Sequence, residues 1–293
     1  MPSNEERRAQ AKRNLDQQVE QRAKETRQRR YLMIGAAVAA AVLAIGATTT
    51  VVLRTNHTSD TAAVDSAAGG ESTGQPGESG QLPKFVASPT LGANCQYPKS
   101  SRPASKQVEP PRTGKVPTEP AQVSVSMMTD QGPIGLILNN AQAPCTVNSF
   151  VSLGNKDFFN DTFCHRLTTS PSLKVLQCGD PDGDGTGGPG YEFANEYPTD
   201  QYQPNDPAAR EPVVYPRGTV AMANAGPGTN GSQFFLVYAD SQLPPQYTVF
   251  GTIQEDGLTT LDKIAKAGVA PGGNGPSDGP PVLKVKIKSV RTD

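Results

Sequence analysis

The chain has 293 residues, with 27 basic and 28 acidic side chains, four cysteines and no tryptophan. This length allows one or two domains, and the near-balance of charge excludes the overall basic character of many nucleic-acid-binding proteins. The charge is unevenly distributed, because residues 1–30 hold nine basic and five acidic side chains, a net of +4, whereas residues 122–293 hold 11 and 17, a net of −6.

Residues 1–30 are polar throughout, which predicts a charged cytoplasmic segment that is either a solvated helix or a disordered arm. A basic arm for nucleic acid is the alternative interpretation. Acidic side chains are interspersed with the basic ones, however, so we expect no nucleic-acid partner.

The next segment, residues 31–53, is predicted to be a transmembrane helix. Leu32 to Leu53 are 22 positions without a charge, and a helix rising about 1.5 Å per residue then crosses the roughly 30 Å hydrocarbon layer. Arginines precede the segment directly, whereas residues 54–80 carry one Arg against four acidic side chains. This asymmetry predicts a single-pass cell-membrane protein with its C-terminal part extracytoplasmic. A cleaved signal peptide is the rival interpretation, although the charged region is long for one.

Residues 54–121 are rich in Ser, Thr, Gly and Pro and contain few large apolar side chains. Such a segment buries too little surface to offset the entropy of ordering it. We therefore expect a disordered linker over this range.

Residues 122–293 show the pattern of a folded domain. Alternating apolar residues at Val123, Val125 and Met127 predict a strand, and a turn at 129–132 predicts a hairpin. Helices are expected at 144–154 and 257–267, and further strands at 162–167, 174–177, 218–222, 233–238, 249–252 and 283–290. Many short strands with two helices predict a mainly β domain, a closed antiparallel β-barrel capped by the two helices.

Several familiar kinds of site are disfavoured by spacing. Asp180 opens a D-x-D-x-D-G run, but the twelfth position of the corresponding calcium loop is Tyr191 and not Glu. The glycines between 179 and 190 lack a phosphate-binding motif. Cys164 and His165 are adjacent on a predicted strand and point to opposite faces, which argues against a Cys/His nucleophile and against zinc. We expect no metal and no cofactor.

The four cysteines face an oxidising compartment if the domain is exported. Cys164 and Cys178 lie on neighbouring predicted strands, which favours a disulfide between them. A bridge from Cys95 to Cys145 would attach the linker to the domain. Four free or buried thiols are the alternative, and the pairing stays open at this point.

Two blocks of sequence, FCHR followed by QCGD and MANAGPGTNGSQFF at 222–235, resemble the cyclophilin-type peptidyl-prolyl cis-trans isomerases, and the similarity extends from about Val123 to Val290. The resemblance implies that Arg166 and Gln177 are the catalytic residues, and that Gln177 and Asn224 can hold the carbonyl and N–H groups that flank the proline. It also implies a groove and pocket for proline-containing polypeptides, formed by Val175, Ala223, Asn224, Ala225, Gln233, Phe235, Leu243 and Tyr247.

The chain departs from the family pattern around the pocket. Between His165 and Gln177 it has three residues more than the family usually has, and Lys174 or Leu173 stands where the family places a pocket phenylalanine. Gln242 replaces a tryptophan that many members have. These differences imply a reshaped proline pocket and poor binding of cyclosporin-type inhibitors.

Rotation about an X–Pro bond makes and breaks no covalent bond, so it requires neither a nucleophile nor a metal. An always-charged guanidinium aimed at the proline nitrogen would favour the twisted state. We therefore expect a membrane-tethered, extracytoplasmic prolyl isomerase that assists folding of exported proteins and acts as a monomeric domain. The alternative is a binding module or chaperone that keeps the proline groove but has little turnover.

Overall fold

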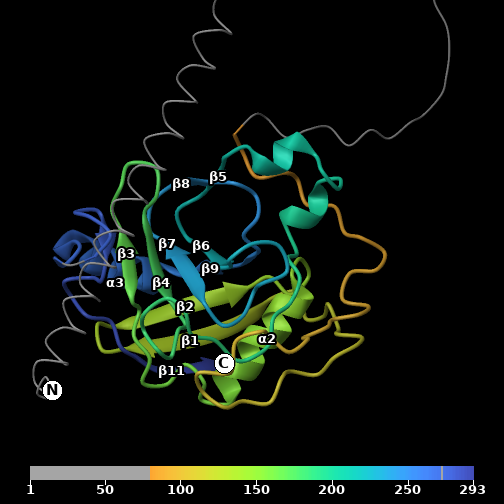
Figure 1. The fold of residues 1–293 in the computed structure, drawn as a ribbon, viewed down its shortest axis with the longest axis horizontal. Coiled ribbons are helices and arrows are strands. Elements are labelled where there is room, and N and C mark those ends of the chain that lie inside the picture. The colour runs from red at the N-terminus through yellow and green to blue at the C-terminus, as the bar shows by residue number, and fades with distance from the viewer. Residues whose placement is uncertain (1–79, 272) are drawn as a thin grey trace, which may run out of the picture. The chain divides into compact units, whose positions relative to one another are not determined.

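Strands account for most of the regular structure in the computed structural model, which describes residues 80–271 and 273–293 (Figure 1). The first hairpin joins β1 (Val123–Thr129) to β2 (Pro133–Leu138), as the alternating pattern predicts. The main sheet also contains β3 (Arg166–Thr168), β4 (Val175–Cys178), β6 (Thr219–Met222), β7 (Phe234–Val237), β9 (Val249–Ile253), β10 (Asp278–Gly279) and β11 (Ile287–Thr292). A separate pair is formed by β5 (Val213–Tyr215) and β8 (Ser241–Leu243).

The predicted closed barrel is not confirmed. The main sheet has nine strands in the order β10-β3-β4-β7-β6-β9-β2-β1-β11, and within the described residues no ladder joins its end strands. β10 spans only two residues, which leaves little backbone to continue the pairing. The chain just before β3 nevertheless contacts the chain near β11, since the Cys164 N–H donates to the Val285 carbonyl and the Ile287 N–H to the Thr162 carbonyl. The fold is therefore mainly β, with a curled sheet that is only partly joined at its edges.

Both predicted helices are confirmed. α2 (Pro144–Asn155) starts with a proline, whose missing N–H would have no partner inside the helix. It buries Val147, Phe150 and Leu153, and the Phe150 ring contacts three other phenylalanine rings in the core. α3 (Glu255–Ala267) packs against β2. Two short 3-10 helices, η1 (Thr199–Gln201) and η2 (Pro207–Arg210), lie in the long connection before β5.

The prediction of a disordered linker over 54–121 is wrong for residues 80–121, which we call the strap. The strap lies against the domain on the side that carries α2 (Figure 1). Cys95 is bonded to Cys145 at the start of α2. Tyr97 is only 6% exposed, and its hydroxyl donates to the Cys145 carbonyl at 2.7 Å.

Few but well-placed apolar side chains hold the strap. Tyr97 makes edge contacts with the rings of Tyr191 and Phe193. Near its start, the strap forms a parallel bridge to β5, and Phe85 makes an edge contact with Tyr197 at 5.7 Å between centroids. A low average content of large apolar residues therefore conceals specific anchoring positions.

The charged segment predicted at 1–30, the transmembrane helix predicted at 31–53 and the start of the predicted linker lie outside the described residues. Across 80–271 and 273–293, no helix is both long and apolar enough to span a bilayer.

Candidate active site

Arg166 lies on β3 directly opposite Gln177 on β4. Its Nη1 donates to Gln177 Oε1 at 3.1 Å. Its Nε and Nη2 donate to the two carboxylate oxygens of Asp278 at 2.7 and 2.9 Å, a bidentate ion pair. The hydrogen bond to Asp278 raises the pKa of Arg166, and the same bond lowers the pKa of Asp278. The guanidinium is therefore permanently charged and held from two sides.

Asp278 is the residue at this site that the sequence reasoning missed. It lies 112 positions after Arg166 in a glycine- and proline-rich stretch. It reaches the site because β10 pairs with β3, with Asp278 opposite Thr168. A two-residue strand is too short to show an alternating pattern, so the sequence does not predict this pairing.

The polar contacts continue from Gln177 along the sheet. Gln177 Nε2 donates to Gln233 Oε1 at 2.9 Å, and Gln233 Nε2 donates to the carbonyls of Gly185 and Gly187 at 3.0 Å each. Three residues implied by the family resemblance thus form one hydrogen-bonded row with the glycine-rich loop. The row fixes the amide orientation of Gln177, and through it the position of the Arg166 guanidinium.

The predicted pocket residues also come together. Val175, Phe235, Leu243, Tyr247 and Ala223 belong to one apolar cluster, which is separate from the main core. Phe235 is 4% exposed and makes an edge contact with Tyr247 at 5.8 Å between centroids. Because Phe235 lies opposite Gln177 across the β4–β7 ladder, the cluster adjoins the polar row.

Of the two candidates for the missing pocket phenylalanine, Leu173 packs against this cluster. Lys174 instead directs its Nζ to the Pro171 carbonyl at 2.8 Å. Leu82 and Phe85 of the strap also contact the cluster. The apolar cluster therefore has an aliphatic side chain at this position and is backed by the strap.

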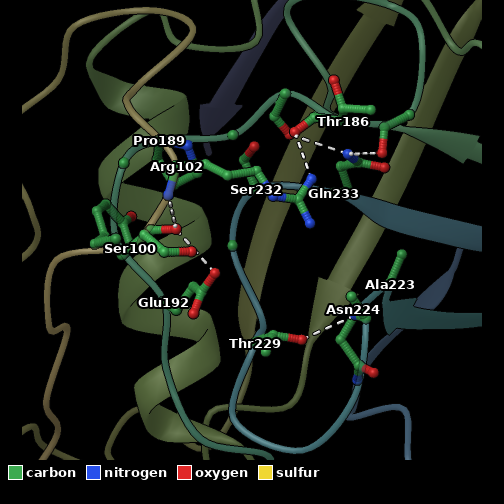
Figure 2. A pocket seen from close by; sticks show the side chains of 18 of the residues that line it. Ser100, Arg102, Thr186, Pro189, Glu192, Ala223, Asn224, Thr229, Ser232 and Gln233 are labelled. Carbon is green, nitrogen blue, oxygen red and sulfur yellow. Dashed lines mark hydrogen bonds between the residues drawn. The ribbon is translucent and has the colours of Figure 1, made fainter.

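A cavity of about 320 Å³ lies beside the apolar cluster and includes Gln177, Ala223, Asn224, Ala225 and Gln233 of the predicted groove. Its other walls come from the glycine-rich loop and from strap residues 100–103 (Figure 2). Within it, the Asn224 side-chain amide donates to the Gln246 carbonyl at 2.9 Å, so this side chain is already engaged inside the protein.

Two disulfides are present, Cys95–Cys145 and Cys164–Cys178, and they are the two pairs considered from the sequence. The second bridge brackets the polar row, because Cys178 follows Gln177 and Cys164 precedes Arg166 by two positions. It therefore ties together the two strands that carry the guanidinium and its amide partner.

Other titratable groups near the site have structural roles. Both carboxylate oxygens of Asp180 accept backbone N–H groups, from Asp182 and Gly185, which shapes the glycine-rich turn. Burial lowers the pKa of His165, and its ring nitrogens have no hydrogen-bond partner among the described residues. Across residues 80–271 and 273–293, no group of three or more His, Cys, Asp or Glu residues is arranged to hold a metal ion.

Comparison with known proteins identifies relatives of the chain. Residues 124–292 match the family described as cyclophilin type peptidyl-prolyl cis-trans isomerase. The chain is 61% identical over 298 residues to a Mycobacterium leprae protein named probable peptidyl-prolyl cis-trans isomerase B, covering 100% of both. It is 72% identical over 212 residues to a Mycobacterium tuberculosis protein of the same name, covering 72% of this chain and 68% of that protein. A crystal structure of a Cryptosporidium parvum cyclophilin type isomerase matches with a TM-score of 0.44 and 26% identity, covering 59% of this chain and 98% of that one.

Proposed function

Since this chain belongs to the cyclophilin-type peptidyl-prolyl cis-trans isomerases, we propose that Arg166 is its catalytic residue and acts on the nitrogen of a substrate proline. The single observation that carries this proposal is the fixed guanidinium of Arg166 next to an apolar cluster. The cluster offers a floor of Val175 and Phe235, while the half-buried Leu243 and Tyr247 give it a reachable rim.

The hydrogen bonds of Arg166 leave donors for substrate. A guanidinium has five N–H groups, and three of those on Arg166 are used, two by Asp278 and one by Gln177. Two N–H groups therefore remain without a partner within residues 80–271 and 273–293. In the twisted state of an X–Pro bond the amide resonance is lost and the proline nitrogen regains its lone pair, which can accept a hydrogen bond. A charged donor already held in place stabilises that state more than the planar one.

The side chains of Gln177 and Asn224 were expected to hold the peptide on either side of the proline. Both amides are engaged within the protein, Gln177 with Arg166 and Gln233, and Asn224 with Gln246. We therefore assign Gln177 a positioning role, in which it orients the Arg166 guanidinium.

The proposal also covers the membrane anchor and the compartment in which the domain acts. We propose a single-pass anchor at residues 31–53, with an extracytoplasmic, monomeric domain that assists folding of exported proteins. The uncharged run of 22 residues supports the anchor, and two disulfides are typical of a domain in an oxidising compartment. Protease added to intact cells should cleave the C-terminal domain, and full protection would contradict the orientation.

The catalytic proposal is tested with the full chain by NMR exchange spectroscopy on an Ala-Pro peptide. Arg166→Ala should lower kcat/KM by roughly a hundredfold or more, the usual effect of removing one preorganised donor to a transition state. Arg217→Ala is the matched control, because Arg217 also forms a bidentate ion pair, with Asp262, but outside the site. Tight peptide binding without acceleration by the wild type would instead support the binding-module alternative.

A further inference from the structure

We propose that the strap completes a second substrate subsite, in which Arg102 selects peptides that carry a carboxylate side chain close to the proline. The inference rests on the proposed function, since the subsite adjoins the groove where the proline would lie. It assigns a role in substrate choice to a residue that lies before the family match at 124–292.

The position of the subsite follows from the cavity beside the apolar cluster. One wall carries Gln177 and Gln233 of the polar row, and the facing wall is the strap turn at 100–103. Figure 2 shows the Arg102 side chain extending from the strap across the cavity toward Gln233. A peptide whose proline occupies the apolar cluster would therefore place a neighbouring side chain within reach of Arg102.

Among the residues that the structure describes, the hydrogen bonds around the cavity leave Arg102 with most of its donors free. Its Nη1 donates to the Thr186 carbonyl at 3.1 Å, which uses one of five N–H groups. The neutral side chains lining the same space are satisfied within the protein, since Gln233 donates to two loop carbonyls and Thr229 both accepts and donates nearby. A guanidinium with free, coplanar donors matches the geometry of a carboxylate.

Glu192 is the other charged side chain lining the cavity in the described part of the chain. Its Oε1 accepts the Ser100 hydroxyl at 2.9 Å, so part of its acceptor capacity is already used by the strap. Figure 2 shows Glu192 beside Ser100, away from the end of the Arg102 side chain. A substrate carboxylate would thus be attracted by Arg102 and repelled if it reached Glu192. Substituting either residue should therefore change the preference for an acidic peptide.

The strap turn is preorganised for this role. The Ser100 N–H donates to the Gly190 carbonyl and the Ser105 N–H to the Gly188 carbonyl, each at 2.9 Å, so both ends of the turn are tied to the glycine-rich loop. The Cys95–Cys145 disulfide fixes the chain just before it. Binding at this wall therefore need not order the strap first, which lowers the entropic cost of recognition.

The experiment compares peptides that are identical except for Glu, Ala or Lys at one position near the proline, each position being tested in turn with the full chain. The readout is kcat/KM from NMR exchange at low salt. We expect a Glu peptide to exceed its Ala counterpart by about fivefold at the position that reaches Arg102, the scale of one partly exposed charge pair. Arg102→Ala should reduce this ratio to about one, Arg102→Lys should retain part of it, and Glu192→Gln should increase it.

Lys99→Ala provides a matched control, because Lys99 is an exposed strap cation outside the cavity, and it should leave the ratio unchanged. A Lys preference, or a Glu preference that survives Arg102→Ala, would overturn the subsite. A wild-type chain that accelerates the isomerisation of no peptide, the Ala peptide included, would instead count against the proposed catalytic function. Thermal unfolding of each variant separates either result from misfolding.

Discussion

Replacing Asp278 with Asn should lower the isomerase activity by about five- to tenfold without preventing folding. The Asn side chain can still accept one hydrogen bond through its carbonyl oxygen, but its NH₂ group would face an N–H of Arg166. The substitution therefore removes one of two charge-assisted bonds and the charge that holds the guanidinium in plane.

The magnitude follows from the exposure of the pair. The side chains of Arg166 and Asp278 are 35% and 29% exposed, so solvent screens their attraction and the bidentate geometry stabilises the arrangement by only about 1 kcal/mol. Since each 1.36 kcal/mol corresponds to about tenfold in rate, misorientation of the donor costs about five- to tenfold in kcat/KM. Arg166→Ala should cost about a hundredfold or more, because it removes the donor itself.

A double-mutant cycle distinguishes positioning from an independent contribution. If Asp278 acts only through Arg166, the variant carrying both Arg166→Ala and Asp278→Asn should be as active as Arg166→Ala alone, within about twofold. Asp278→Glu should recover part of the loss, and the Nε–H resonance of Arg166 should exchange faster with water in Asp278→Asn. Losses that multiply in the double variant, or full activity in Asp278→Asn, would refute the reasoning.

Further predictions concern stability and can be checked by chemical denaturation. Burial raises the pKa of Glu196 to about 7, although backbone N–H groups at the start of α2 donate to it. The folded state therefore keeps a proton that the unfolded chain loses above about pH 4.5, and the free energy of unfolding should fall by roughly 3 kcal/mol as the pH rises from 4.5 to beyond 7. Glu196→Gln should flatten this dependence, and an unchanged slope would contradict it. The Cys164–Cys178 disulfide joins residues 14 positions apart, and replacing both cysteines with Ser should lower the free energy of unfolding by about 3 kcal/mol. An unfolding midpoint that does not shift when the wild type is reduced would contradict this. Removing Cys95–Cys145, with a separation of 50, should cost about 4 kcal/mol and expose the strap to limited proteolysis; a strap that resists protease after reduction would count against its anchoring.

The sequence was most informative where a local pattern repeats. Alternation over Val123 to Met127 predicted the β1–β2 hairpin, and Pro144 marked the start of α2. The two family blocks located Arg166 and Phe235, which the fold places on nearby strands. These features depend on side-chain periodicity or on contiguous motifs, both of which are visible without coordinates.

Long-range pairings with weak local signals were not predictable. Asp278 reaches Arg166 through a two-residue strand. The strap is held by one disulfide, by a few aromatic contacts such as Tyr97 on Phe193, and by scattered hydrogen bonds to the domain. The closed barrel was expected because strand counting alone does not reveal which strands end the sheet. In each case the decisive contact joins residues far apart in sequence, and average composition is insensitive to it.

The attachment of Cys95 to the start of α2 bears on how this enzyme should be produced for study. A recombinant fragment cut at residue 124, where the family match begins, would leave Cys145 as an odd thiol and strip the cover from Tyr191 and Phe193. Such a fragment could form disulfide-linked dimers through Cys145, and it would lack the cavity wall that the strap provides. Kinetic or inhibitor data from the fragment would then not represent the protein with its strap in place.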